Sequence, residues 1–263
     1  MSGSIQTVSG GGKPIFELSG LSFAYKAGDV LNNISLAVAE GESLGIVGES
    51  GSGKTTLLSL LLRLLKARRG TVAFKGRPLA EMTGKDVRNF RTRVQPVFQD
   101  PFLSLDPAQK VGSIIGEPLT GLKLVKTREE KKERIRRVLE KVGLEADAAA
   151  RYPAAFSGGQ RQRIAIARAL VTNPQVLIAD EAVSALDIIT KIEILKLLHD
   201  LKEKGNFTLI FVSHDLPAVA DISERIVALD HGEIIEDAPA RRFLHSPTHP
   251  RVRQLVESSL TLS

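Results

Sequence analysis

The chain has 263 residues, of which 43% are hydrophobic and 25% are charged, and its formal net charge is +6, values typical of a globular protein with an ordinary core. It contains no cysteine, which excludes disulfides and cysteine-ligated metal sites, and it has no apolar run long enough to cross a membrane. The positive charge fits either an ordinary cytosolic protein or one whose partner is a polyanion, such as a nucleotide, a nucleic acid or an anionic membrane face.

The first third of the chain is expected to begin with a disordered tail. Residues 1–13 are rich in serine and glycine and have no apolar stretch, so they do not resemble a secretory signal. The run Thr55–Leu65 carries leucine on most of its helical faces, which predicts a deeply buried helix. Short strands are expected on either side of that helix, at Leu21–Ala24, Ser43–Val47, Thr71–Phe74 and Val94–Phe98.

The middle of the chain, from about residue 104 to residue 170, has almost no strand pattern. Two helices are expected within it, at Thr127–Val142 and at Gly158–Val171. The first of them is so densely charged that a solvated helix face is its simplest interpretation. This part of the chain therefore predicts a helical insertion.

The last third returns to short strands that alternate with helices. Apolar runs of strand length, Val176–Ala179 and Thr208–Val212, flank a long predicted helix at Ile188–Lys204. Strand, helix and strand at this spacing predict a βαβ unit and hence a parallel sheet. Apolar runs on either side of His231–Gly232 predict a hairpin with its turn at these two residues.

Residues Gly48–Thr55 match the phosphate-binding pattern G-x-x-x-x-G-K-[ST] without a gap. The glycines allow backbone N–H groups to converge on an anion, and the N-terminus of the following helix also favours phosphate. Lys54 is expected to reach the β- and γ-phosphates, and the Thr55 hydroxyl to ligate Mg²⁺. The pattern therefore predicts a nucleoside triphosphate as ligand. Its expected contacts are Gly48, Glu49, Ser50, Gly51, Ser52, Gly53, Lys54, Thr55 and Thr56.

Two acidic residues, Asp180 and Glu181, follow the apolar run at residues 176–179. Ligands of open parallel sheets bind at the carboxyl ends of the strands. Beside a phosphate loop, Asp180 is expected to hold Mg²⁺, mostly through water, and Glu181 to polarise the water that attacks the γ-phosphate. The alternative for an acid pair in this position is the N-cap of a helix.

Ser157, Gly158, Gly159 and Gln160 precede a predicted helix and form a second candidate phosphate-binding helix start. A short serine- and glycine-containing motif also occurs by chance in flexible loops. Two such helix starts in one chain mean either that one of them is unused or that two molecules share a nucleotide.

Three single residues stand at the ends of predicted strands: Tyr25, Gln99 and His214. Each is by default a structural residue, and for Tyr25 this means a half-buried tyrosine at a sheet edge. The alternative places Gln99 and His214 beside the γ-phosphate and stacks the Tyr25 ring on a base.

In their order along the chain, these motifs resemble the ATP-binding cassette of ABC transporters. The resemblance covers about Phe16 to Gly232. It implies that Glu181, His214 and Gln99 are catalytic and that Thr55, Gln99 and Asp180 hold the metal. Its landmarks are the aromatic loop at Tyr25, Walker A at Gly48–Thr55, the Q-loop glutamine Gln99, the signature at Phe156–Gln160, Walker B with the catalytic glutamate at Val176–Glu181, the D-loop at Ser184–Asp187 and the switch histidine His214.

The resemblance implies an α/β fold, that of a P-loop NTPase ABC cassette with a RecA-like parallel-sheet core, an antiparallel β subdomain and an inserted helical subdomain. A single domain would span residues 14–245, with a short C-terminal extension at 246–263. The family's cassettes pair head to tail, so Ser157–Gln160 of one chain, with Asp187, would close on the ATP that Walker A of the other holds.

The resemblance narrows to importers of the peptide, opine and nickel class through Gln99–Pro107, Phe156–Ile164 and Ser246–Pro250. It implies ATP-driven uptake of peptides, nickel or a related small solute. The implied partners are a second ATPase subunit, identical or different, two transmembrane permease subunits and, indirectly, an extracytoplasmic solute-binding protein. The implied location is the cytoplasmic face of the inner membrane. The sequence departs from the family at Ala182, where proline is usual, at Phe156, where the general signature has leucine, and in lacking a longer cysteine-bearing tail.

The same resemblance predicts a surface that couples the cassette to the membrane subunits, between Gln99 and Gly116. The segment after Gln99 contains two prolines and leads straight into the helical insertion, so contact between ATP and Gln99 can tilt that insertion. Leu103 is expected to lie on this surface. The alternative is that Leu103 and its apolar neighbours cover the domain's own core.

Two other functions remain open at this point. The first is a cassette ATPase that acts on nucleic acid in repair or translation, although such relatives usually carry a coiled coil, a zinc module or a second cassette. The second is an inactive regulatory cassette, which conflicts with the intact Lys54, Asp180 and Glu181. We expect no nucleic-acid partner.

Overall fold

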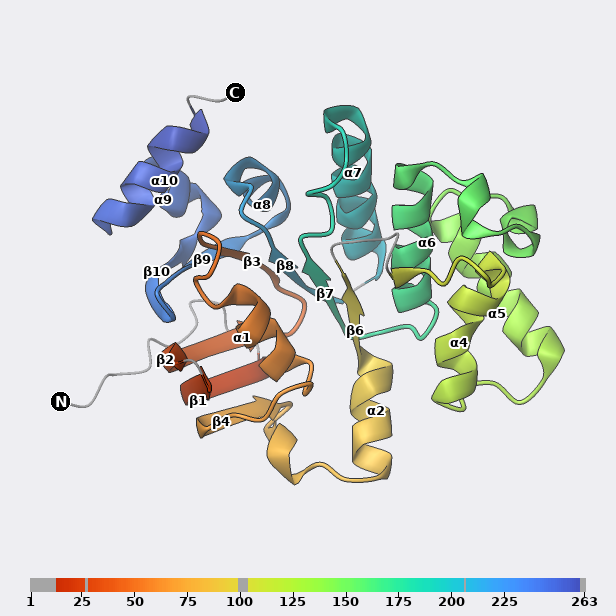
Figure 1. Ribbon diagram of the computed structural model, residues 1–263, viewed down its shortest axis with the longest axis horizontal. Coiled ribbons are helices and arrows are strands. Elements are labelled where there is room, and N and C mark those ends of the chain that lie inside the picture. The colour runs from red at the N-terminus through yellow and green to blue at the C-terminus, as the bar shows by residue number, and fades with distance from the viewer. Residues whose placement is uncertain (1–12, 27, 99–103, 206, 261–263) are drawn as a thin grey trace. The chain divides into compact units, whose positions relative to one another are not determined.

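The computed structural model describes residues 13–26, 28–98, 104–205 and 207–260 (Figure 1). The chain divides into two compact units, one formed by Met1–Gly84 with Thr208–Ser263 and the other by Lys85–Phe207. All of the predicted tail except Lys13 lies outside the described residues, and so do Gln99 and Leu103. The roles proposed for Gln99 and Leu103 therefore stay predictions.

The first unit contains an antiparallel sheet with the strand order β2-β1-β4-β5. The strand predicted at Leu21–Ala24 is only the end of the much longer β1, and β2 was not expected. Register shifts between β1 and β2 around Leu18 and Leu21 break the simple alternation that would reveal two long strands. The strands are β1 (Pro14–Tyr25), β2 (Gly28–Ala39), β4 (Arg69–Phe74) and β5 (Arg77–Pro78).

A second group of strands in this unit is built around β3 (Ser43–Val47), which is buried at every residue. The strands β8 (Thr208–Val212) and β9 (Arg225–Asp230) pair with β3 in parallel, and β10 (Glu233–Pro239) pairs with β9 in antiparallel. Strands buried on both faces read as continuous apolar runs, and for this reason β3 and β8 were predictable. The hairpin predicted at residues 231–232 is confirmed.

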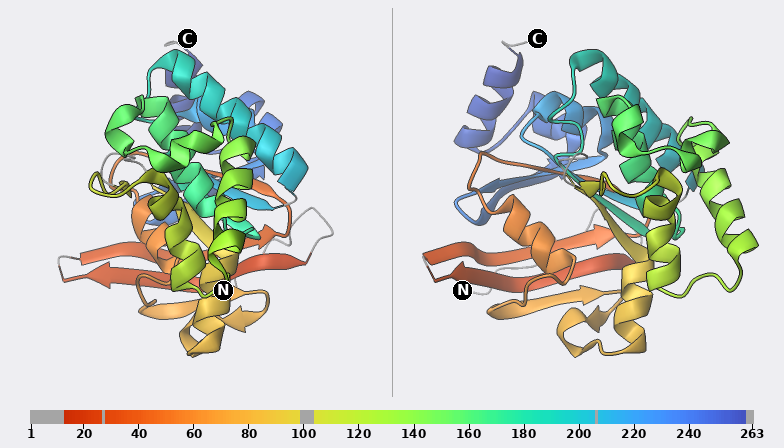
Figure 2. Two further views of the ribbon diagram at one scale, coloured as in Figure 1. Left: turned by 90° about the vertical axis from the view of Figure 1, so that its right-hand side faces the viewer. Right: turned by 45° about the vertical axis from the view of Figure 1, so that its right-hand side comes forward.

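The helix α1 (Lys54–Leu61) lies between these two groups of strands (Figure 2). It ends before Leu65, the predicted end. Arg63 has a positive φ of 57°, and the N–H groups of Arg63 and Leu64 return to the carbonyls of Leu60 and Ser59, which is a Schellman closure. The Arg63 guanidinium then donates to the carbonyls at residues 79 and 82, each at 2.8 Å. The C-terminal end of α1 was not predictable from the sequence, because Arg63 takes the left-handed conformation in place of the glycine that usually marks a helix end.

The α-helices in the C-terminal part of the first unit are α8 (Leu216–Ile222), α9 (Ala240–His245) and α10 (Pro250–Leu260). The buried Glu236 carboxylate accepts hydrogen bonds from the backbone N–H groups of Thr248, at 2.9 and 3.0 Å, and His249, at 2.9 Å. Burial alone would raise the pKa of Glu236, but these hydrogen bonds outweigh it and the pKa is lowered. The motif at Ser246–Pro250 is thus held to β10.

The second unit begins with α2 (Lys85–Arg93), which leads into β6 (Val94–Val97). Between residues 104 and 170 the described chain is helical and contains no strand, as predicted. β6 pairs in parallel with β7, and α7 follows β7 along the chain. The remaining α-helices and strands are α4 (Val111–Gly121), α5 (Arg128–Lys141), α6 (Gly158–Leu170), β7 (Val176–Asp180) and α7 (Ile188–Gly205).

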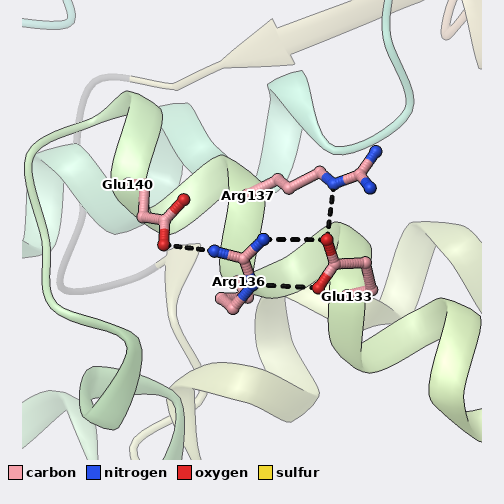
Figure 3. Close-up of polar contacts among 4 residues, drawn as sticks. All are labelled: Glu133, Arg136, Arg137 and Glu140. Atoms are coloured by element: carbon pink, nitrogen blue, oxygen red, sulfur yellow. Dashed lines mark hydrogen bonds and ion pairs between the residues drawn. The ribbon is translucent and has the colours of Figure 1, made fainter.

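The charged helix α5 is capped by Thr127, whose hydroxyl accepts from the Glu130 N–H at 3.1 Å. Its buried side consists of three apolar residues, at 135, 138 and 139. On the outer side, Glu133 pairs with Arg136 and Arg137, and Arg136 also pairs with Glu140 (Figure 3). Hydrogen bonds from Arg136 and Arg137 lower the pKa of Glu133 to about 2. The helix therefore has the solvated face that its charge pattern predicts.

Candidate nucleotide-binding site

The predicted phosphate loop joins β3 to α1 in the first unit, and it surrounds the side chain of Lys54. Only 9% of Lys54 is exposed. Its ammonium donates to the carbonyl oxygens of Gly48, at 2.6 Å, and Glu49, at 2.8 Å, and lies 3.5 Å from the Ser52 hydroxyl oxygen. A buried charge is costly unless it is hydrogen-bonded. The loop thus holds a buried, hydrogen-bonded positive charge where phosphate oxygens would meet it.

The remaining loop residues divide into an outer and an inner set. Residues 49–51 are exposed, whereas Ser52, Gly53 and Thr56 are buried. Thr55 lies in the first turn of α1 with its side chain exposed. Its hydroxyl lies beside the helix N-terminus and offers an oxygen ligand, the type that Mg²⁺ prefers.

His214 follows β8 just as the phosphate loop follows β3. The two strands are parallel neighbours, with Ile46 opposite Val212, and the Ser213 N–H donates to the Ile46 carbonyl at 3.2 Å. His214 and the loop therefore leave the sheet at the same, carboxyl edge. His214 is exposed there, and the next residue, Asp215, caps α8.

Tyr25 is the last residue of β1, and 50% of it is exposed. One edge of its ring packs on Phe23, with the ring centroids 4.9 Å apart and the planes at 81°. Half of the residue is thus open to solvent, which suits stacking on a base. The same position also fits the alternative interpretation, in which Tyr25 is a half-buried structural residue at the edge of a sheet.

Asp180 and Glu181 lie in the second unit, where Asp180 is the last residue of β7. Glu181 has a positive φ of 48°, and its carbonyl accepts from the Ser184 N–H at 3.1 Å and from the Ser184 hydroxyl at 2.9 Å. A non-glycine residue in this conformation costs about 1–3 kcal/mol and is concentrated at functional sites. The alternative of an N-cap is wrong, because the next helix begins only at Ile188.

The motif at Ser157–Gln160 starts α6 with a complete capping box. The Gln160 N–H donates to the Ser157 hydroxyl at 3.3 Å, and the Gln160 side-chain oxygen accepts from the Ser157 N–H at 3.1 Å. The expected helix start is confirmed. Beside it is a cavity of about 350 Å³. This cavity is lined by Gly143, Leu144, Ser157, Gly159, Gln160, Arg163, Thr190 and Glu193.

Asp187 and the cavity are linked by Thr190, a residue that the sequence analysis missed. The Thr190 hydroxyl and N–H donate to the two Asp187 carboxylate oxygens at 2.6 and 3.0 Å. A Cβ on Gly159 would lie 2.4 Å from the Thr190 methyl carbon, so these two residues are in close contact. The signal that could have found Thr190 is the capping spacing D-x-x-T at the start of a helix.

Two general features of the described residues bear on the site. None of their helices is both long and apolar enough to cross a membrane. Within the same residues, no three histidine or carboxylate side chains gather as a ready-made metal site.

Comparison with known sequences identifies close relatives over nearly the whole chain. A family model described as "ABC transporter" matches residues 31–184. The oligopeptide transport ATP-binding protein OppF of Streptococcus mutans is 39% identical over 251 residues, which cover 94% of this chain and 82% of that protein. The oligopeptide transport ATP-binding protein AppF of Bacillus subtilis is 41% identical over 249 residues, which cover 94% of this chain and 75% of that protein.

Two solved structures are similar to this one. The ATP-binding cassette MJ0796, in a dimeric post-hydrolysis state bound to ADP and Pi, has a TM-score of 0.76 and 32% identity, covering 86% of this chain and 99% of that chain. CbiO1 of Clostridium perfringens, part of the ABC transporter complex cbiONQ, has a TM-score of 0.79 and 27% identity, covering 93% of this chain and 99% of that chain. The α/β cassette fold predicted from the sequence is therefore confirmed.

Proposed function

The chain belongs to the ATP-binding proteins of the ABC transporter family, and on that premise we propose that it hydrolyses ATP to power an importer of peptides. The observation that carries the proposal is the buried Lys54 ammonium, held by the carbonyls of its own loop at 2.6 and 2.8 Å. Phosphate oxygens carry full negative charge and make stronger hydrogen bonds than neutral carbonyls. The oxygens of a bound triphosphate can therefore replace the loop carbonyls as hydrogen-bond acceptors of the Lys54 ammonium, and the buried charge is never left unpaired.

The relatives support a peptide rather than another solute. Two of the similar sequences are named oligopeptide transport ATP-binding proteins, and each aligns with 94% of this chain. Nickel, which the sequence resemblance also allowed, is the weaker candidate. The ATPase subunit of such an importer works on the membrane subunits and does not contact the solute, so no residue of this chain is proposed to choose the peptide.

The proposed division of labour at one nucleotide follows the motif residues. Lys54 neutralises the β- and γ-phosphates, and the exposed Tyr25 ring stacks on the base. Glu181 orients the attacking water, and His214 holds the γ-phosphate and that water. Thr55, Asp180 and Gln99 would hold Mg²⁺, which supplies charge neutralisation on the phosphates when bound.

The proposed assembly is a head-to-tail pair of cassettes. One support is the solved dimer of a similar cassette. The other is the N-terminal end of α6, where Ser157 and Gly159 line an open cavity. Ser157–Gln160 of one chain, with Asp187, would close on the ATP held by the other chain. The second ATPase subunit can be identical or different.

Two transmembrane permease subunits and an extracytoplasmic solute-binding protein complete the proposed importer. CbiO1, to which this chain is similar, is part of an ABC transporter complex. The proposed location of this chain is accordingly the cytoplasmic face of the cell membrane, where it is held peripherally by the permease subunits.

The deciding experiment reconstitutes the chain with candidate permease subunits, a second ATPase subunit and a solute-binding protein, in vesicles that hold the ATPase subunits and ATP inside. Uptake of a labelled oligopeptide should require ATP and should be lost with Glu181→Gln, which serves as the matched control because it keeps the shape of the side chain. ATPase activity that responds to DNA or RNA and not to the permease subunits would instead favour the nucleic-acid cassette.

A further inference from the structure

Two hairpin turns in the first unit have nearly the same backbone. Lys75–Gly76 joins β4 to β5 with φ values of 49° and 76°, and His231–Gly232 joins β9 to β10 with φ values of 45° and 79°. Both are two-residue turns in which each central residue is left-handed, the conformation typical of tight hairpins. The two glycines therefore face the same conformational demand.

The surroundings of the two glycines differ completely. The Gly232 N–H donates to the Ser52 carbonyl in the phosphate loop at 3.0 Å, and the Gly232 carbonyl accepts from the Asn32 N–H at 2.8 Å. A Cβ on Gly232 would lie 2.2 Å from the Val30 carbonyl oxygen, whereas a Cβ on Gly76 would meet nothing within 4 Å. Only the turn at residues 231–232 is locked between β2 and the phosphate loop.

We propose that Gly232 is a positioning residue for the nucleotide, an inference that rests on the proposed ATP-binding function of the loop. In a trans peptide the C=O and the N–H point in opposite directions. By holding the Ser52 carbonyl, Gly232 directs the N–H of Gly53 away from the hairpin. The Gly53 N–H precedes Lys54 at the start of α1, where it can join the groups that bind phosphate.

Only glycine can occupy this position without disturbing the loop. Ordinary contacts between carbon and a carbonyl oxygen are about 3.3 Å or longer, and a side chain on Gly232 would start at 2.2 Å from the Val30 oxygen. The obstacle is backbone and cannot rotate away. The turn must therefore shift by about 1 Å, and it would carry the Ser52 peptide with it.

The test compares Gly232→Ala with Gly76→Ala in the full chain. Both variants place alanine at a left-handed position, so both bear the same conformational cost. Gly232→Ala should weaken ATP binding and lower kcat/KM by on the order of 10- to 100-fold, as misplacement of a site by about 1 Å does. Gly76→Ala should bind ATP like the unmodified chain. Circular dichroism and thermal melting confirm that each variant is folded.

The outcomes separate this inference from the proposed function. If the unmodified chain does not bind ATP, the proposed function fails. If it binds ATP and a folded Gly232→Ala binds equally well, only the positioning role of Gly232 is wrong.

A second measurement on the unmodified chain decides the matter even if Gly232→Ala does not fold. Hydrogen exchange of the Gly232 amide should slow when a non-hydrolysable ATP analogue binds, because the Ser52 carbonyl becomes more firmly held. Exchange of the Gly76 amide should not change. An unchanged Gly232 amide at saturating analogue would overturn the inference.

Discussion

Thr190 donates a 2.6 Å hydrogen bond from its hydroxyl to the carboxylate of Asp187, while its methyl group lies against Gly159. One side chain therefore touches both the D-loop residue and the helix start that are proposed to face the partner's nucleotide. The Thr190 hydroxyl and N–H together lower the pKa of Asp187 below its ordinary value of 3.8. The Asp187 carboxylate is thus kept ionised and in a fixed orientation.

Thr190→Val and Thr190→Ser should separate these two contacts. Valine keeps a methyl group but removes the hydroxyl, so the pKa of Asp187 should rise towards 3.8, whereas serine should leave it low. A carboxyl titration followed by NMR measures both. We expect Thr190→Val to reduce ATP hydrolysis by the cassette dimer while ATP binding by the single chain stays normal. An Asp187 titration unchanged by valine would show that the hydroxyl contact has no influence.

Lys54→Met should abolish most ATP binding and hydrolysis. Methionine keeps much of the buried stem but removes the charge that the phosphates would meet. Losing a preorganised contact of this kind lowers turnover by on the order of 10²–10³-fold. The measurements are nucleotide titration and ATPase assay of the folded variant. Lys85→Met, at an exposed lysine of α2, is the control and should behave like the unmodified chain. Near-normal ATP affinity of Lys54→Met would count against the phosphate role.

Glu181→Gln should leave ATP bound but reduce turnover by on the order of 10²–10⁴-fold, the usual contribution of a catalytic base. Glutamine has the same shape and meets the same left-handed backbone, so the variant tests the carboxylate and not the strain. Turnover in the assembled transporter is the quantity to measure. If it were unchanged, another group would have to orient the water.

His214→Ala should lower hydrolysis and reduce ATP affinity less than Lys54→Met does. His214 stands at the sheet edge next to the loop and is exposed, and its proposed contacts are with the γ-phosphate and the water and not with the rest of the nucleotide. ADP binding, which lacks those contacts, should be unaffected. A large loss of ADP affinity would indicate a structural role for His214.

Acid should leave the Glu133 ion pairs of α5 intact to an unusually low pH. The pKa of Glu133 in the folded chain is about 2, against an ordinary value of 4.5. A lowered pKa contributes stability that is fully present above about 4.5 and is lost as the pH falls through about 2. Because the pairs are exposed, their effect on stability should be small and should fade with salt. NMR titration of Glu133 in the chain and in Arg136→Met, where the pKa should rise, checks this expectation.

Much of the site was predictable because its information is local in the sequence. The phosphate loop, the capping box between Ser157 and Gln160 and the turn at His231–Gly232 each depend on residues within a few positions of one another. Buried strands such as β3 and β8 can be recognised in the sequence by their continuous apolar runs. The chemistry of ATP binding can therefore be inferred from the sequence alone.

The contacts that hold the site in place were decided by the tertiary structure. The Gly232 N–H donates to the Ser52 carbonyl at 3.0 Å although the two residues are far apart in the chain. The Thr190 methyl group packs against Gly159, which is also distant in the sequence. Likewise, the left-handed backbone of Glu181 is imposed by its surroundings, since glutamate has no intrinsic preference for that conformation. Periodicity and motifs describe what a residue prefers among its neighbours, and only the packing of distant segments determines what each backbone group finally touches.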